Sequence, residues 1–252
     1  MHRRLAISPF LLFAFFALFA ISCSSSDTVE SKKSVDDIYA EAMKLYRGDD
    51  WTEALSNFDI IKLQYPASQY ADDAQYYVAE ISYRRGEFVL AAFNYSSVRR
   101  SFPTSELAKP ASFKVAQCYE ELALPSDRDQ EYTKKAINAY MDFQNIYPTD
   151  SLALVALEHI RDLRGRLAEG YMLVAEHYTT TGSRKSALIY YDMLIKEYPD
   201  TQYYEDALVE KLRIHFGQAK IEDCRATISQ YRRTVQTPTR KNEVDQMEKE
   251  LP

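Results

Sequence analysis

The stretch ALIYYDMLIKEYP, residues 187–199, carries the pattern that decides the fold. Alanine is followed by a large residue four positions on, another seven positions on, and proline twelve positions on. On a helix, this spacing places the first three residues on one face, and proline marks the point where the helix ends. The alanine-to-proline spacing recurs in five segments, the last one degraded, which begin at Ala54, Ala91, Ala136, Ala187 and Ala226.

The five segments predict a repeat of helix, turn, helix and proline. The apolar pattern is helical from residue 35 onward and contains no convincing strand. The unit resembles the tetratricopeptide repeat, whose period is about 34 residues. We therefore predict an all-α fold: an α-solenoid of about five tetratricopeptide-like repeats over residues 35–238, wound as a right-handed superhelix.

Glycines and insertions refine this repeat pattern. Four of the six glycines fall where the first helix of a pair should turn back, namely Gly48, Gly86, Gly182 and Gly217. The spacing between the repeats leaves room for a loop near residues 124–130, LPSDRDQ, and for extra helix around residues 152–167. Residues 239–252 are polar, so they are expected to form a tail that frays.

The N-terminus has the features of a targeting signal. Two arginines precede an uncharged run over residues 5–21, a length at the short limit for a membrane-spanning helix. The following Ala20-Ile21-Ser22-Cys23 resembles the lipobox of bacterial lipoproteins, although leucine is usual at the position of Ala20. This resemblance implies a signal peptide over residues 1–22, acylation of Cys23 and a flexible tether over residues 23–34. Because serine and not an acidic residue follows Cys23, it also implies the periplasmic face of the outer membrane.

Composition and motifs exclude several classes of function. The 37 acidic and 31 basic side chains give a net charge of −6, whereas binding to nucleic-acid phosphates needs a basic surface. The sequence contains no phosphate-cradling glycine motif, no GxSxG and no HExxH. Its histidines have no metal-ligand spacing, and Cys118 and Cys224 are expected to be buried free thiols. We predict a protein that is not an enzyme and holds no cofactor or metal.

The first helices of the early repeats carry candidate binding residues. First helices of such solenoids line a groove, and tyrosine supplies contact area together with a hydroxyl group. Arginine can pair with a terminal carboxylate. An apolar peptide with a free C-terminus would suit this surface, unless the tyrosines only pack between repeats. The predicted groove residues are Tyr39, Met43, Tyr46, Arg47, Tyr76, Tyr83, Arg84 and Phe113.

A longer resemblance runs from about residue 38 to residue 208. The most specific stretches are RLAE at 166–169, VAEHYT at 174–179 followed by Gly182, YPDTQ at 198–202 and DAL at 206–208, with DIYA at 37–40 and QYP at 64–66. With the lipobox, these stretches make the chain similar to the BamD family, lipoproteins of the outer-membrane β-barrel assembly complex.

This resemblance implies a scaffold adaptor. BamD-like proteins bind the periplasmic POTRA domains of the BamA barrel through their C-terminal repeats. Their N-terminal repeats are thought to contact the C-terminal signal of unfolded barrel proteins. Other lipoproteins of the complex are further possible partners, and the membrane contact is through the lipid anchor only. Carried onto this chain, the BamA-facing candidates are Tyr190, Lys196, Glu197 and Asp200, and Tyr190 stands where relatives carry a basic residue.

Two alternatives remain open at the level of the sequence. One is a repeat lipoprotein that binds a glycan or another ligand, although the insertions here are too short for a dedicated ligand domain. The other is a cell-envelope coordinating adaptor, although no heptad segment is visible between residues 23 and 36. Partners found with the protein would distinguish them.

Overall fold

The structure is a computed structural model that describes residues 33–252. Cys23, the predicted signal peptide and most of the predicted tether lie outside these residues. The described part of the chain forms eleven helices and no strand. Their bounds are α2 Val35–Arg47, α3 Trp51–Gln64, α4 Ala71–Arg84, α5 Phe88–Ser101, α6 Ala108–Glu121, α7 Glu131–Ile146, α8 Ser151–Thr180, α9 Arg184–Glu197, α10 Tyr203–Gly217, α11 Ile221–Thr234 and α12 Lys241–Lys249.

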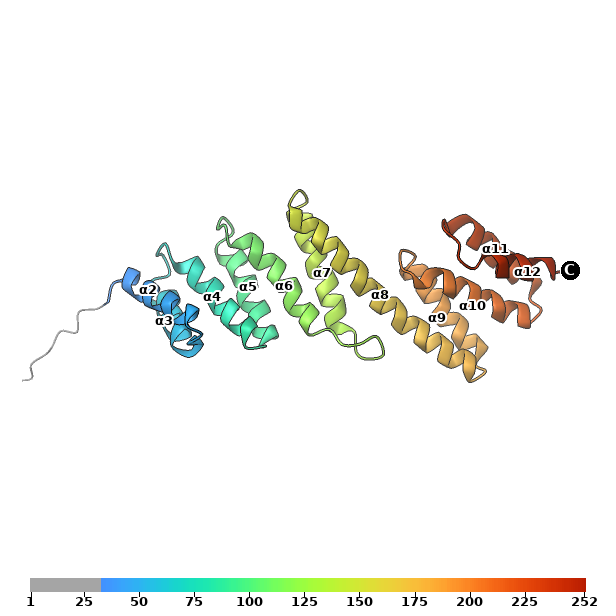
Figure 1. The fold of residues 1–252 in the computed structure, drawn as a ribbon, viewed down its shortest axis with the longest axis horizontal. Coiled ribbons are helices and arrows are strands. Elements are labelled where there is room, and N and C mark those ends of the chain that lie inside the picture. The colour runs from blue at the N-terminus through green and yellow to red at the C-terminus, as the bar shows by residue number, and fades with distance from the viewer. Residues whose placement is uncertain (1–32) are drawn as a thin grey trace, which may run out of the picture.

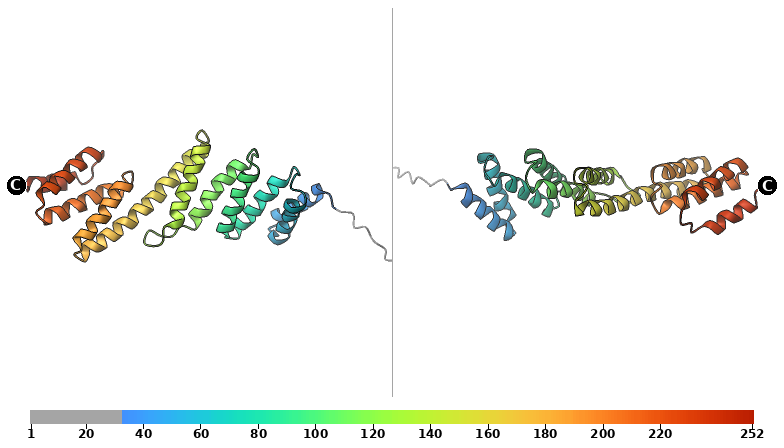
Figure 2. Two further views of the ribbon diagram at one scale, coloured as in Figure 1. Left: turned by 180° about the vertical axis from the view of Figure 1, so that it is seen from behind. Right: turned by 90° about the horizontal axis from the view of Figure 1, so that it is seen from above.

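The helices follow one another along an elongated rod (Figure 1). Each helix from α2 to α11 packs mainly on the helices before and after it in the chain. The second view, from behind, and the third, from above, show the same serial order (Figure 2). Five helix pairs, from α2/α3 to α10/α11, therefore form a helical repeat solenoid, and the predicted all-α repeat fold is confirmed.

The alanine pattern works as predicted in four repeats. Ala54, Ala91, Ala136 and Ala187 are all fully buried, which lets a neighbouring helix approach closely. The aromatic residue before each proline is the C-cap of its helix. There its backbone N–H donates to the carbonyl four residues earlier, as from Tyr65 to Ile61 over 2.9 Å.

The fifth repeat departs from the predicted register. Ala226 is exposed, whereas Cys224 is fully buried and lies three residues after the start of α11, as Ala54, Ala91 and Ala187 do in their own helices. The prediction that Ala226 takes the alanine position is therefore wrong by two residues. The physical requirement is a small side chain at the helix contact, and cysteine meets it. Both Cys118 and Cys224 are buried free thiols, as predicted.

The tight turns between paired helices need a left-handed residue. Gly86 and Gly182 supply it, with φ of +73° and +79°. In the first and last repeats the same position, two residues before the second helix, is taken by Asp49 and Ala219, with φ of 59° and 54°. Gly48 and Gly217 precede these residues by one and two positions and do not adopt positive φ.

Two insertions shape the middle of the rod. A loop connects α6 to α7 at the predicted place, and α8 is 30 residues long, which accounts for the predicted extra helix. α7 packs on the first half of α8, where Gln144 donates a hydrogen bond to the Ala153 carbonyl over 2.8 Å. α9 packs on the second half, where Tyr190 stacks on Tyr178.

The C-terminal segment is a docked helix, whereas the sequence predicts a frayed tail. Val244 of α12 is only 1 % exposed and packs into the core of the last repeats. Ion pairs surround it, such as Arg213 with Glu243 at 2.6 Å and Arg240 with Asp206 at 2.8 Å. A helix with one buried apolar position has too weak an apolar period to be recognised, yet it caps the open end of the solenoid.

Candidate functional site

The sequence places its first candidate site on α2, α4 and α6, and the structure gathers most of those tyrosines. Tyr39 stacks on Tyr70, with ring centroids 4.2 Å apart and planes 12° apart. Tyr70 in turn donates a hydrogen bond from its hydroxyl to Asp36 over 2.7 Å. Tyr46 meets Tyr77 edge-on at 4.9 Å. We call Tyr39, Tyr46, Tyr70, Tyr76, Tyr77 and Tyr83 the N-terminal tyrosine cluster.

The cluster continues through the second repeat. Tyr76 meets Tyr95 edge-on at 5.5 Å, and the Tyr83 hydroxyl donates to Glu121 over 3.2 Å. Partial burial, with the neighbouring charge of Asp73, raises the pKa of Tyr39 to about 12, and partial burial with Glu121 does the same for Tyr83. These hydroxyls therefore stay protonated and act as hydrogen-bond donors at any physiological pH.

Cations flank the cluster. The guanidinium of Arg84 lies 5.1 Å from the centre of the Tyr46 ring and 4.0 Å from Asp49. Lys114 lies 4.6 Å from the centre of the Tyr83 ring and 3.9 Å from Glu80. Arg47 is exposed and forms no ion pair within residues 33–252. Of the two predicted arginines, Arg47 is thus the better placed to meet a new anion.

Two predicted groove residues have little surface to offer a ligand. Met43 and Phe113 are 8 % and 7 % exposed, and both pack in hydrophobic core clusters. Phe113 contacts Tyr140 and Phe143 edge-on at 5.4 and 5.2 Å. Both side chains are therefore used mainly for packing between helices.

The structure shows a recurring bond that the sequence analysis missed. In three repeats, a buried tyrosine of the second helix donates its hydroxyl to a glutamate of the first helix. The pairs are Tyr95 to Glu80 at 2.5 Å, Tyr140 to Glu120 at 2.6 Å and Tyr231 to Glu205 at 2.6 Å. Two of these tyrosines follow the repeat alanine by four residues, which is the only sign of the bond in the sequence.

The predicted partner-facing residues do not form one cluster. Tyr190 joins an aromatic group on α8, since it stacks on Tyr178 at 5.6 Å and lies 6.3 Å from Tyr171. Lys196 and Glu197 are exposed and pair with each other at 3.1 Å.

Asp200 is engaged elsewhere, with Arg164, a residue that the sequence analysis did not select. The Nε and Nη2 atoms of Arg164 donate to the two Asp200 carboxylate oxygens over 2.8 and 2.5 Å. These hydrogen bonds lower the pKa of Asp200, and the pair ties α8 to the turn before α10.

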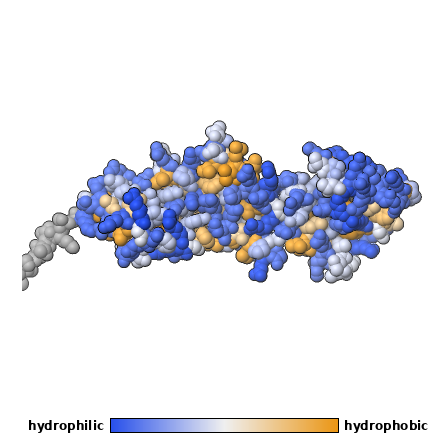
Figure 3. Space-filling view, in the orientation of Figure 1, coloured by the Kyte–Doolittle hydropathy of each residue, from blue (hydrophilic) through white to orange (hydrophobic). Residues whose placement is uncertain are grey.

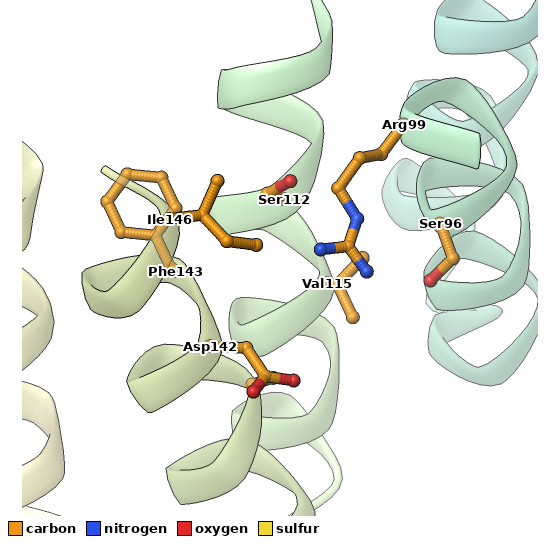
Figure 4. Close-up of a pocket in the computed structure, with 8 residues that line it drawn as sticks. Ser96, Arg99, Ser112, Val115, Asp142, Phe143 and Ile146 are labelled. Atoms are coloured by element: carbon orange, nitrogen blue, oxygen red, sulfur yellow. The ribbon is translucent and has the colours of Figure 1, made fainter. Parts of the chain in front are cut away.

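A small pocket lies between α5, α6 and α7. Figure 4 shows Arg99 and Asp142 pointing into it from opposite sides, with Val115 and Ile146 beside them. Its volume of about 50 Å³ is well below the roughly 150 Å³ of a cavity that holds benzene. The pocket has room for water and not for a ligand.

Apolar side chains also reach the surface. Figure 3 shows a large apolar area over the upper end of α7 and α8, with smaller apolar areas elsewhere on the same face. Ile146 at the end of α7 and Leu154 and Leu157 near the start of α8 are 45 %, 71 % and 44 % exposed. In the described part of the chain, no group of three or more acidic, histidine or cysteine residues is arranged to hold a metal ion. None of the helices from α2 to α12 is long and apolar enough to span a membrane.

The fold defines a helical repeat protein with aromatic surfaces at both halves. A family model described as YfiO, outer membrane lipoprotein, matches residues 31–229. The chain belongs to this family of outer membrane lipoproteins.

Solved structures with similar helices are tetratricopeptide repeat proteins. One, from Parabacteroides merdae, is 15 % identical, with 79 % of each chain covered and a TM-score of 0.39. The TPR2AB domain of yeast Sti1, solved in complex with pHSP90, is 15 % identical, with 84 % of this chain and 96 % of that chain covered and a TM-score of 0.45. A protein from Thermus thermophilus is 13 % identical over 86 % and 98 % of the two chains, with a TM-score of 0.36.

Proposed function

We propose that this outer membrane lipoprotein is a non-enzymatic scaffold adaptor of the machinery that assembles β-barrel proteins in the outer membrane. Membership of the outer membrane lipoprotein family supports the compartment. A rod of repeats with binding surfaces at separate places suits an adaptor that holds two proteins at once. The proposed partners are a BamA-like barrel protein with POTRA domains and the C-terminal signal of unfolded barrel proteins.

The observation that carries the proposal is the N-terminal tyrosine cluster with Arg47 beside it. Tyr39, Tyr46, Tyr76 and Tyr83 are partly exposed, so each offers a ring face or edge and a protonated hydroxyl. Arg47 is an exposed cation that can pair with a terminal carboxylate. An extended peptide that ends in an aromatic residue matches both features.

The peptide site is tested with a labelled peptide that ends in an aromatic residue and a free carboxylate. Replacing Arg47 by glutamine is expected to weaken its binding roughly threefold, as for an exposed charge pair worth under about 1 kcal/mol. The same peptide with an amidated C-terminus should bind the wild type and the Arg47→Gln variant equally. Lys44→Gln on the same helix is the control, since Lys44 is also exposed but lies outside the predicted groove.

The tyrosines themselves are tested by combining Tyr39→Ala with Tyr76→Ala. This double variant is expected to weaken the binding of the peptide by about 1–3 kcal/mol. Tyr132→Ala serves as the control, because Tyr132 is a partly exposed tyrosine of α7 outside the cluster. Equal affinity for the double variant and the control would assign the cluster to packing alone.

The second half of the proposal concerns the C-terminal repeats. We place the POTRA-binding surface around Tyr190, with Lys196, Glu197 and Asp200 as further candidates. Tyr190 is the strongest of the four, because it is partly exposed and belongs to an aromatic group. Asp200 already forms an ion pair with Arg164, and Lys196 forms one with Glu197. We further propose that the protein is held at the periplasmic face by acylation of Cys23.

A further inference from the structure

A cleft opens where the long helix α8 separates the second helices of the third and fourth repeats. α7 packs on the first half of α8 and α9 on the second half, so the start of α7 and the middle of α9 stand apart with α8 as the floor between them (Figure 1). The cleft has a volume of about 270 Å³. We call it the junction cleft; it is lined by Ser126, Gln130, Lys134, Leu167, Gly170, Tyr171, Val174 and Tyr190.

One wall of the junction cleft is a loop held in a fixed shape. The Gln130 side chain donates hydrogen bonds to the carbonyls of Pro125 and Arg128 over 2.6 and 3.0 Å. The carbonyl of Ser126 lies so close to Gly170 that a Cβ at that glycine would be 2.7 Å from it. Only glycine permits this approach, so the loop between α6 and α7 rests directly on α8.

The remaining surface of the junction cleft is apolar and aromatic. Leu167 forms the floor at 6 % exposure, and Val174 is 38 % exposed at the rim. Tyr171 and Tyr190 provide partly exposed rings, and Tyr190 is braced by its stacking on Tyr178. This braced pair of rings is ready to receive an apolar group without rearrangement.

A single charged side chain lines the cleft. Lys134 stands at the start of α7, is exposed, and forms no ion pair within residues 33–252. The next residue, Lys135, pairs instead with Glu131 at 2.6 Å. An apolar slot with one unpaired cation at its edge is complementary to an apolar side chain that is followed closely by a carboxylate.

We propose that the junction cleft binds a segment of a partner protein that inserts one bulky apolar side chain and places a neighbouring carboxylate against Lys134. The volume exceeds the roughly 150 Å³ of a cavity that holds benzene, so a phenylalanine or leucine side chain fits. The inference rests on the proposed adaptor function, because that function supplies a partner, and it extends the site to α7 and the loop before it. Continuity with Tyr190 places the cleft on the proposed partner surface.

The test uses the full-length lipidated protein in phosphatidylethanolamine nanodiscs and two probes, acetyl-(4-fluoro-phenylalanyl)-glutamyl amide and its glutaminyl counterpart. Binding is followed by ¹⁹F NMR titration. The glutamyl probe is expected to bind roughly threefold more tightly than the glutaminyl probe, as for an exposed ion pair. Lys134→Gln should abolish this preference while both probes still bind.

A matched pair of variants locates the site. Val174→Asp places a negative charge at the rim of the cleft and is expected to lower the affinity for the glutamyl probe at least about fivefold. Leu173→Asp is the control, because Leu173 is the preceding residue, is similarly exposed at 43 %, and does not line the cleft. It should leave both affinities unchanged.

Binding that survives Val174→Asp, or a glutamyl preference that survives Lys134→Gln, would place the site elsewhere and overturn the proposal, as would the absence of binding by either probe. The probe titration uses purified protein, so these failures are separate from a failure of the adaptor function. That function is judged by what co-purifies from the envelope. If the probes bind but no POTRA-containing partner co-purifies, the binding site in the junction cleft is supported and the adaptor function is refuted.

Discussion

Three tyrosines at equivalent positions of the repeats allow a direct measurement of what the recurring tyrosine–glutamate bond contributes. Tyr95, Tyr140 and Tyr191 are at most 1 % exposed, and each follows its repeat alanine by four residues. The hydroxyls of Tyr95 and Tyr140 donate to glutamates over 2.5 and 2.6 Å. The Tyr191 hydroxyl only meets the hydroxyl of Thr179 at 3.5 Å. Phenylalanine in place of each tyrosine removes the oxygen and keeps the ring.

The expected cost follows from the acceptor. A hydrogen bond to a charged group contributes about 1.5–3 kcal/mol, and its loss also leaves a half-buried carboxylate short of a donor. Tyr95→Phe and Tyr140→Phe should therefore each lower the free energy of unfolding by about 2 kcal/mol. Tyr191→Phe loses a long contact between neutral groups and should cost under about 1 kcal/mol.

Thermal unfolding of the three variants measures this difference. For a chain of this size, about 2 kcal/mol corresponds to a fall in Tm of roughly 4–8 °C. The Tyr191→Phe variant is the internal control, because it shares the burial, the repeat position and the size of the change. Equal losses for all three variants would show that the acceptor is irrelevant and would refute the reasoning.

Three further predictions concern the C-terminal cap and the N-terminus. Burial alone would raise the pKa of Glu205, but hydrogen bonds from Thr239, Tyr231 and the backbone of Arg240 outweigh it and lower the pKa to about 2. The stabilisation of the cap by ionised Glu205 is then fully present above about pH 4.5 and is lost as the pH falls towards 2. The hydrogen exchange of residues 235–249 should therefore rise over that window. Replacing Glu205 by glutamine should remove this pH dependence. Val244→Ala removes the one fully buried side chain of α12, at a cost of about 1–3 kcal/mol, and should raise exchange in α12 but not in α4 or α5; unchanged exchange in α12 would contradict the cap. Cys23→Ala should release the protein from outer-membrane fractions, and continued fractionation with them would contradict the proposed anchor.

The repeat architecture was predictable because its requirements are local. A small residue, an aromatic residue four positions on and a proline that stops the helix recur at fixed distances, and no long-range information is needed to find them. The prediction was wrong at Ala226 because it followed the identity of one amino acid. The helix contact asks only for small volume, which Cys224 supplies. Similarly, Asp49 and Ala219 adopt the left-handed conformation, whereas the glycines one and two residues before them do not.

The candidate sites were less predictable because they depend on contacts between helices. The row of first-helix tyrosines could be projected, but Met43, four residues after the partly exposed Tyr39, is buried in the core. The glutamates that accept the tyrosine hydroxyls stand at unequal places in their helices, so no spacing rule finds them. The junction cleft arises from the length of α8 and the close approach of Ser126 to Gly170, which only the folded chain displays.

The central claim is the adaptor function, and co-purification tests it most directly. The tagged protein is extracted from envelope membranes in mild detergent, and the proteins that accompany it are identified by mass spectrometry. We predict a stoichiometric barrel protein with POTRA domains, whose yield falls with Tyr190→Ala and is unchanged with Lys44→Gln. A glycan-uptake or peptidoglycan-linked partner in its place would contradict the account of function and leave the repeat fold standing.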